Sequence, residues 1–315
     1  QAAFRVIQDL KNTGTWDPHC DDASEALQIA ICEEKYDVYD LLVQDGVSLK
    51  MKNLRRIIMK SEIPLESFKK AIQYMKDTDN WDPKCDDASK ALETAICVEK
   101  YDVHDLLVQD GVSLKMKNLP GVIRESEISL ESLKKAIQRS KDNGSWDPKC
   151  DDASKALETA ICVEKYHVHD LLVQDGVSLK MKNLPNVIMK SEISLESVKK
   201  AIQHLKDTDN WDPKCDDASK ALETAICVKK YDIYDLMVQD GVALKMNNLL
   251  SIIMGSEVLS LESVKKAIQH LKDTDNWDPK CDGASDALSF ACWQEKYDVV
   301  ELLVQEGFLL NEESS

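Results

Sequence analysis

A unit of 65 residues occurs five times along this chain with few changes. Its clearest marker is Trp-Asp-Pro, which begins at positions 16, 81, 146, 211 and 277 and so recurs at intervals of 65, 65, 65 and 66 residues. A second marker, the run from Asp86 to Cys97, returns almost unchanged at 151–162 and 216–227. Self-similarity at a fixed period of this size is typical of stacked arrays, in which each unit covers the apolar face of its neighbour. The repetition therefore predicts recognition or assembly rather than a single catalytic centre.

The spacing of apolar residues within one unit predicts helices. Residues 65–75 carry an apolar stripe that recurs every three or four positions, which is typical of an amphipathic helix. A polar stretch over 76–84 reads as a loop, after which we expect Asp87 to cap a helix and Asp102 to cap the next. Gly111 is expected to end that helix in a left-handed conformation, and Pro120 is tolerated at the start of a last short helix.

These patterns predict four helices per unit, arranged as two hairpins, and no run alternates as a strand would. The fold class expected is therefore all-α, a helical solenoid of paired helices with about five double repeats. We expect a single repeat domain over 1–315, with units at 1–64, 65–129, 130–194, 195–260 and 261–315. The divergent first and last segments are expected to act as caps, with excision from a longer array as the alternative.

Residues 91–114, from Ala91 to Leu114, resemble an ankyrin repeat. An alanine-rich first helix, a short turn, a Val-x-x-Leu-Leu second helix and a Gly-containing end all have counterparts here. The resemblance implies that each 65-residue unit holds two ankyrin-like repeats of about 33 residues. Three features depart from that family: Lys90-Ala91-Leu92-Glu93 replaces Thr-Pro-Leu-His, Glu99-Lys100 replaces the Gly-His turn, and the Trp-Asp-Pro loop is longer. A paired-helix solenoid of another kind is the competing interpretation.

The chain is acidic, with a net charge of −17 and a pI near 4.8. This sign repels phosphate backbones and anionic lipid, so we expect no nucleic-acid partner. No apolar run reaches the roughly 18–20 residues of a membrane span, so no membrane insertion is expected either. A basic protein partner, a cation or solubility alone fits this charge, and solubility is the favoured explanation. The near-identical units would suit a repetitive partner.

Ten cysteines fall two to a unit, separated in the second unit by the twelve residues from Cys85 to Cys97. A helix of about ten residues spans about 15 Å, whereas disulfide-bonded Cα atoms lie about 4.4–6.8 Å apart, so bridging within a unit is disfavoured. In the last unit Cys292 aligns with Ile96 rather than with Cys97. Reduced thiols and a cytoplasmic protein are therefore expected. A secreted protein with disulfides is the alternative, for which Gln1 would follow a removed signal peptide; a fragment boundary explains Gln1 equally well.

No metal, cofactor or catalytic site is expected. The cysteines lack the close spacing of zinc ligands, and the Asp-x-x-Cys-Asp-Asp loop around Asp82 lacks the ligand series of a calcium-binding loop. Every candidate nucleophile recurs four or five times, whereas a catalytic group normally occurs once. His104, His167 and His169 are interpreted as exposed helix-surface residues. We therefore expect a protein that is not an enzyme.

The ankyrin resemblance implies a contact surface. Mapped onto this chain, the family's variable contact positions would line a concave acidic ribbon. They are Asp21, Asp22, Asp86, Asp87, Ser89, Cys97, Val98, Asp151, Asp152, Cys162, Asp216, Asp217 and Cys227. The sequence thus predicts a non-enzymatic protein-binding scaffold that recognises a macromolecular partner through this ribbon. The alternatives are a secreted disulfide-containing protein acting on a host or on other cells, and a structural protein that self-assembles through its near-identical units.

Overall fold

The computed structural model describes residues 2–60, 63–125, 129–255 and 261–310, in which every regular element is a helix and no strand occurs. Four helix types recur in order, and we call them the A, B, C and D helices. The A helices are α1 (Ala2–Asn12), α5 (Leu65–Asp77), α9 (Leu130–Asp142), α13 (Leu195–Asp207) and α17 (Leu261–Asp273). The B helices are α2 (Asp21–Cys32), α6 (Asp86–Cys97), α10 (Asp151–Cys162), α14 (Asp216–Cys227) and α18 (Asp282–Trp293).

The remaining helices are shorter. The C helices are α3 (Tyr36–Gln44), α7 (Tyr101–Gln109), α11 (Tyr166–Gln174), α15 (Tyr231–Gln239) and α19 (Tyr297–Gln305). The D helices are α4 (Met51–Met59), α8 (Leu119–Arg124), α12 (Leu184–Met189) and α16 (Met246–Met254). A single 3₁₀ turn precedes α8 (η1, Met116–Asn118) and α12 (η2, Met181–Asn183), and in both cases proline follows at the start of the α-helix.

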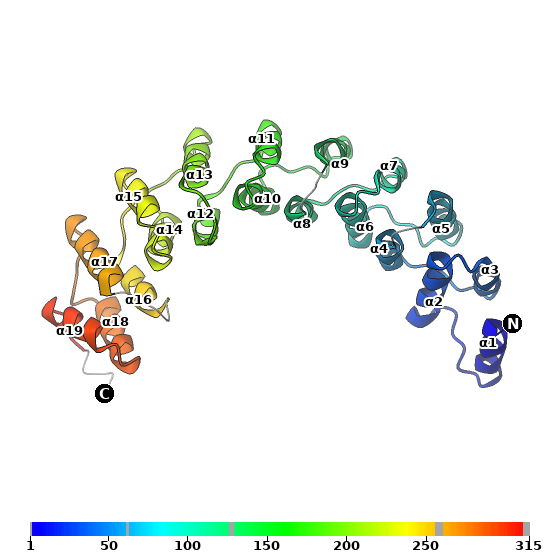
Figure 1. Cartoon of the computed structure of the whole chain (residues 1–315), viewed down its shortest axis with the longest axis horizontal. Helices are drawn as coiled ribbons and strands as arrows, with labels where there is room; N and C mark the ends of the chain where they lie inside the picture. The colour runs from blue at the N-terminus through cyan, green and yellow to red at the C-terminus, as the bar shows by residue number, and fades with distance from the viewer. Residues whose placement is uncertain (1, 61–62, 126–128, 256–260, 311–315) are drawn as a thin grey trace. The chain divides into compact units, whose positions relative to one another are not determined.

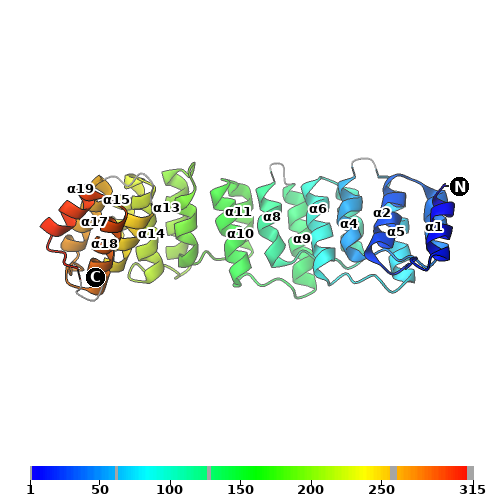
Figure 2. The ribbon, with the colours of Figure 1, turned by 90° about the horizontal axis from the view of Figure 1, so that it is seen from below.

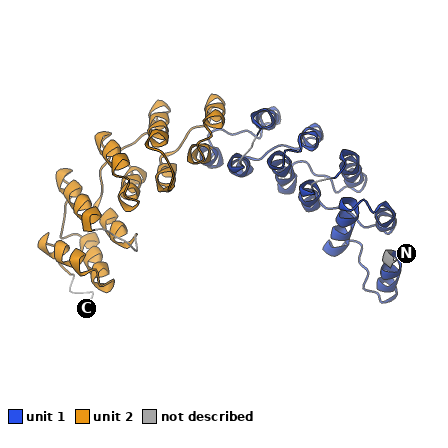
Figure 3. Ribbon diagram, in the orientation of Figure 1, with its two compact units in different colours: residues 1–156 blue, residues 157–315 orange. Residues whose placement is uncertain are grey.

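Two compact units, residues 1–156 and 157–315, divide the chain within α10 (Figure 3). In the first unit the B and D helices α2, α4, α6 and α8 contact one another in sequence, while the A and C helices α5, α7 and α9 form a second row (Figure 1). The second unit repeats this arrangement, with α12, α14, α16 and α18 in one row and α13, α15, α17 and α19 in the other. Figure 2 shows the helices of each unit standing side by side, with the connecting loops at their ends. Each unit is therefore a two-layer helical repeat.

The core lies between the two layers and follows the predicted stripes. On α5 the side chains of Phe68, Ala71 and Met75 are fully buried, and on α6 those of Leu92 and Ala95 are as well. A fully buried Leu or Phe side chain stabilises a fold by about 1.5–3 kcal/mol relative to its exposed state. Because no helix buries its stripe alone, each depends on the helices before and after it in its own unit.

The Trp-Asp-Pro loop is held by contacts that recur along the chain. The Asp82 side chain accepts a hydrogen bond from the backbone N–H of Lys84 at 2.9 Å, which closes a turn. Lys76, at the end of α5, lies 5.7 Å from the centre of the Trp81 ring and also forms a 2.6 Å ion pair with Asp110 at the end of α7. The loop thus clamps the C-terminal ends of neighbouring A and C helices, which explains why its sequence recurs so faithfully.

Helix ends confirm one expectation and correct two. Gly111 follows α7 with φ +94°, a left-handed conformation that glycine adopts at little cost, as predicted. The predicted cap Asp87 is wrong: α6 begins at Asp86, and the preceding Cys85 occupies the cap position, its sulfur accepting a hydrogen bond from the backbone N–H of Ala88 at 3.3 Å. Asp102 is not a cap either, because α7 already begins at Tyr101. Both carboxylates lie inside the first turn, where they favour the positive end of the helix dipole.

Candidate functional site

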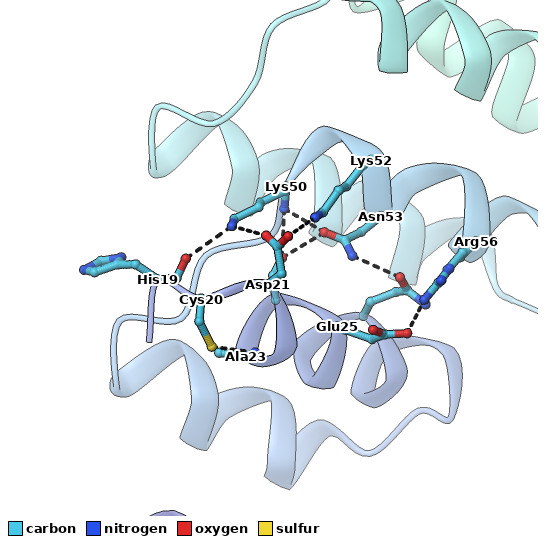
Figure 4. Close-up of polar contacts among 11 residues, drawn as sticks. His19, Cys20, Asp21, Ala23, Glu25, Lys50, Lys52, Asn53 and Arg56 are labelled. Carbon is cyan, nitrogen blue, oxygen red and sulfur yellow. Dashed lines mark hydrogen bonds and ion pairs between the residues drawn. The ribbon is translucent and has the colours of Figure 1, made fainter. Parts of the chain in front are cut away.

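The first carboxylate of the Asp-Asp pair ties its B helix to the following D helix. Asp21, at the start of α2, forms 2.5 Å ion pairs with both Lys50 and Lys52 (Figure 4). Its copy Asp86 pairs with Lys115 and Lys117, and Asp216 pairs with Lys245. Hydrogen bonds from these lysines hold the pKa of Asp21 and of Asp86 at about 2, well below the ordinary value. The carboxylates of Asp21 and Asp86 are therefore ionised at neutral pH, and lysines of the chain itself pair with all three aspartates.

The second carboxylate of each pair remains available. Asp22, Asp152 and Asp217 are exposed and Asp87 is half-buried. Among the described residues none of the four accepts a hydrogen bond or forms an ion pair through its side chain. Asp151, the first carboxylate of the third copy, is exposed. Of the acidic positions predicted to meet a partner, the second members are therefore the ones best placed to do so.

Ser89 belongs to the interior rather than to a contact surface, since only 1% of its surface is exposed. Its hydroxyl donates to the side-chain oxygen of Asn118 at 3.0 Å and accepts from the backbone N–H of Lys115 at 2.7 Å. Asn118 in turn donates to Glu93 at 2.7 Å. Similar bonds join Ser24, Asn53 and Gln28 in the first copy, and Asn248 and Glu223 in the fourth. The serine thus anchors a D helix to a B helix.

The predicted cysteine positions lie at the C-terminal ends of the B helices. Cys97, Cys162 and Cys227 are half-buried, and Val98 beside the first of them is exposed. Burial, with the nearby Glu223 carboxylate, raises the pKa of the Cys227 thiol to about 11, which leaves it protonated at neutral pH. All ten cysteines are free thiols in the structure. Free thiols agree with the reduced state that the sequence favours, but they do not assign the chain to a compartment.

The histidine interpretation is wrong for two of the three residues. His104 is fully buried, and the side chain of His169 is 13% exposed. Both lie on C helices and face the A–C layer, as His204 and His270 do from the A helices. The Nε2 atoms of these four residues are buried without a hydrogen-bond partner. The side chains that cover these histidines belong to a neighbouring helix, so the residue pattern within one helix could not reveal their burial.

The described ranges contain neither a metal-binding cluster nor a membrane-spanning helix. No group of three or more His, Cys, Asp or Glu side chains there is arranged to hold a metal ion. No helix in those ranges combines the length and the apolar character needed to cross a bilayer. The absence of a cofactor and of catalysis stays a prediction.

Sequence reasoning missed the exposed side of the D helices. On α4 the exposed residues include Arg55, Arg56, Met59 and Lys60. The corresponding positions read Pro120, Gly121, Arg124 and Glu125; then Pro185, Asn186, Met189 and Lys190; then Leu250, Ser251, Met254 and Gly255. Apart from the two prolines, which are buried, these side chains are exposed or partly exposed. A signal for them was present, because they change in size, polarity and charge within a unit that is otherwise nearly constant.

In each unit the B and D helices thus present an open surface made of the second carboxylates and the variable D-helix residues. We call it the B–D surface. In the first unit its two components lie together, because Asp87 of α6 and Arg55 and Arg56 of α4 line one cavity. No protein-family model matches this sequence, and no curated protein matches it significantly.

Proposed function

We propose that this chain is a non-enzymatic scaffold that binds a macromolecular partner through the B–D surface. The partner would be a protein that offers basic groups to Asp22, Asp87, Asp152 and Asp217. Specificity would come from the variable residues of the D helices. The ankyrin-like organisation inferred from the sequence is part of this proposal.

One observation carries the proposal: the copies keep their framework and vary on one exposed face. The clamp formed by Lys76, Trp81 and Asp110 recurs as Lys206, Trp211 and Asp240, and again at 272, 277 and 306 with glutamate as the acid. Against this constancy, position 56 is arginine and its copies are glycine, asparagine and serine. A surface that varies over a fixed framework is suited to recognising an irregular partner, because each copy can meet a different feature.

Only some of the acidic residues of the predicted ribbon take part in the proposed binding. Asp21, Asp86 and Asp216 already pair with lysines that lie just before the D-helix segments, so a basic partner would have to displace an internal cation to use them. The second carboxylates require no such exchange. Their charge would steer a basic partner and raise its association rate. A surface preformed on packed helices loses little conformational entropy on binding.

A variant with less variable D helices tests this function. Arg55→Leu, Arg56→Ser, Arg124→Met and Asn186→Ser replace variable residues with those of other copies and remove three positive charges. The control K84Q/K149Q/K214Q removes three positive charges from exposed loop lysines. Each protein is immobilised, incubated with cell extract, and its retained proteins are quantified by mass spectrometry.

We expect the wild type and the loop control to retain the same proteins, and the D-helix variant to lose most of them. A captured protein is then purified and its affinity for all three chains is measured by calorimetry. Equal affinity for all three chains would show that the substituted D-helix residues are not part of the binding surface. A loss in the loop control as well would show that net charge, not the B–D surface, governs capture.

Self-association is a second candidate, favoured by apolar side chains at the two ends of the array. In the first unit Phe4 and Val6 of α1 are 56% and 57% exposed. In the second unit Trp293 and Tyr297, at the end of α18 and the start of α19, are 74% and 71% exposed. Sedimentation across a hundredfold concentration range, with V6D and W293D as variants, would separate this from a monomeric binder. A mass that stays monomeric throughout would exclude it.

A further inference from the structure

A cavity of about 440 Å³ lies between α4 and α6 in the first unit. We call it the α4 groove, and its lining residues are Lys52, Arg55, Arg56, Met59, Asp87 and Lys90. Four of these six side chains are basic, in a chain whose net charge is −17. Met59 is 58% exposed and adds an apolar contact point to the groove. The groove is therefore a local concentration of positive charge on an acidic protein.

Two of the four cations have no partner among the described residues. Lys52 forms a 2.5 Å ion pair with Asp21, and Arg56 pairs with Glu25, as Figure 4 shows. Arg55 and Lys90 form no ion pair within the described ranges. Asp87 is the only carboxylate among the described residues that line the groove, and it is half-buried. The groove therefore holds two exposed cations that form no ion pair with any described residue.

Basic cavities elsewhere differ because their cations are already engaged. A cavity of about 360 Å³ between α5 and α7 is lined by Lys69, Lys70 and Lys76 among others. Lys69 pairs with Glu66 at 2.8 Å, Lys70 lies over the ring of Tyr36, and Lys76 pairs with Asp110. A matching cavity recurs between α13 and α15, so this feature belongs to the repeating framework.

The positive charge at the positions of the α4 groove is highest in the first copy and declines along the chain. The six positions hold four basic residues and one acidic residue in the first copy. The same positions hold three basic residues and one acidic residue in the second copy, and two basic residues and one acidic residue in the third. In the fourth copy Asn247, Leu250 and Ser251 replace the basic residues of the D helix, and Asp286 replaces Lys90. If these positions had a purely structural role, we would expect the same residues at every junction. The serine and asparagine of the buried set are kept in this way.

We propose that the α4 groove binds two carboxylates of an acidic segment of the partner protein, with an apolar side chain of that segment against Met59. This proposal rests on the proposed function and names the chemistry that one part of the B–D surface selects. The planar guanidinium of Arg55 can hold one carboxylate through two parallel hydrogen bonds, and Lys90 supplies the charge for a second. Asp87 beside them would take a basic group of the same segment.

A short acidic segment fits better than a polyanion. The charge of −17 acts over the whole surface, so a nucleic acid that extends beyond the groove meets net repulsion. At physiological salt the repulsion decays over about 8 Å, so a ligand confined to the groove mainly meets the local cations. The exposed thioether of Met59 also favours a peptide, which can offer an apolar side chain next to its carboxylates.

The test uses a fluorescein-labelled peptide, Gly-Glu-Glu-Leu-Glu-Lys-Gly, titrated with the full chain and followed by fluorescence anisotropy. The groove variant R55L/K90D takes both residues from the fourth copy and changes the net charge by three units. The loop variant K84Q/K149Q/K214Q changes it by the same amount and leaves the groove intact. Circular dichroism melts of all three proteins check that the fold is retained.

We expect the groove variant to bind the peptide at least about tenfold more weakly than the wild type, and the loop variant to match the wild type within about twofold. Binding should also weaken as salt is raised. No binding to the wild type, or equal binding to both variants, would overturn the proposal. A phosphoserine peptide with its glutamates changed to glutamine is the second probe; if only that peptide requires Arg55 and Lys90, the groove binds phosphate and the proposal is wrong.

The two proposals fail in different ways. If the acidic peptide does not bind while protein capture still depends on the D helices, the groove chemistry is wrong and the scaffold function stands. If the peptide binds through Arg55 and Lys90 while capture is the same for all chains, the groove is an anion site but the wider B–D surface is not the recognition surface.

Discussion

The two rows of helices differ in one buried contact at their junctions. Between B and D helices the same polar set returns, with Ser89, Asn118 and Glu93 joined by hydrogen bonds in the second copy. Tyrosine–serine hydrogen bonds and Lys–Asp ion pairs recur between A and C helices as well, but three of these junctions also hold a pair of rings whose identity changes from copy to copy. The ring pairs are Tyr39–Tyr74, His169–His204 and Tyr234–His270, with centroids 6.1, 5.9 and 5.6 Å apart.

This difference shows which contacts a repeat can alter. A buried hydrogen-bonded set depends on every member, because losing one leaves the others desolvated and unpaired. An edge-to-face ring contact depends mainly on area and shape, so tyrosine and histidine can replace one another. The A–C junctions accordingly tolerate orphaned ring nitrogens, which His104, His204 and His270 all carry. The buried polar set of the B–D junctions is therefore kept from copy to copy, whereas the ring contact of the A–C junctions varies.

The largest effect is expected when the B–D set is broken. In Asn118→Leu, the Ser89 hydroxyl loses its acceptor and the Glu93 carboxylate loses its donor, while the residue stays buried and similar in volume. We expect a loss of about 2–3 kcal/mol in the free energy of unfolding, because buried polar groups are left unsatisfied. Urea unfolding followed by circular dichroism measures it.

A double-mutant cycle with Ser89→Ala sharpens this result. Since Ser89 and Asn118 belong to one set, the double variant should lose less than the sum of the single losses. Additive losses would show that the two residues act independently. The exposed loop substitution Asn143→Ala is the control, and it should change stability by no more than about 0.5 kcal/mol.

The A–C junctions should respond to pH instead. Burial lowers the pKa of His204 and of His270 below the ordinary value of 6.5, and the neighbouring His169 lowers that of His204 further. Below pH 6.5 the unfolded chain therefore takes up protons that the folded chain does not, so stability is constant above that pH and falls as the pH drops through the window below it. The midpoint of urea unfolding, measured from pH 7.5 to pH 5, should decline accordingly.

The variant H204Y/H270Y should flatten this decline. Tyrosine occupies the same position in the first copy, where the Tyr74 hydroxyl donates to the backbone oxygen of Val47. Because tyrosine stays neutral across this range, the variant should lose less stability between pH 7.5 and pH 5 than the wild type. If both chains show the same slope, the buried histidines do not govern the pH response and the contrast between the two rows is weaker than the contacts indicate.

The sequence predicted the features that are encoded within one helix. The apolar stripe of α5, the glycine end of α7 and the short helix with Pro120 at its start follow from local spacing and backbone preference, and each is present. Features that join positions about 30 residues apart were not predicted. Asp86 and Lys115 form an ion pair although no local pattern relates them, and His104 meets its surroundings only after the A helices pack.

The N-cap of the B helices shows a second limit of prediction from the sequence. Asp87 has the residue type that caps helices best, but Cys85 reaches the free backbone N–H first, because the helix begins immediately after it. Residue preference alone could not place that boundary to within two positions. The candidate surface was predictable in another way, since the variation at positions 55, 56 and 59 stands out once the copies are aligned.

The smallest effect is expected at the exposed edge of the B–D junction. Hydrogen bonds from Lys115 and Lys117 hold the pKa of Asp86 at about 2, below its ordinary 3.8, so these ion pairs favour the folded state above pH 3.8 and lose that effect as the pH falls toward 2. The carboxylate is nevertheless open to solvent, where water and salt screen the attraction. Asp86→Asn should therefore shift the urea midpoint at pH 7 far less than Asn118→Leu does, and the shift should vanish at high salt. A shift as large as that of Asn118→Leu would show that surface charges, and not buried hydrogen bonds, stabilise the B–D junction. The two rows of helices would then differ in surface charge rather than in buried hydrogen bonds.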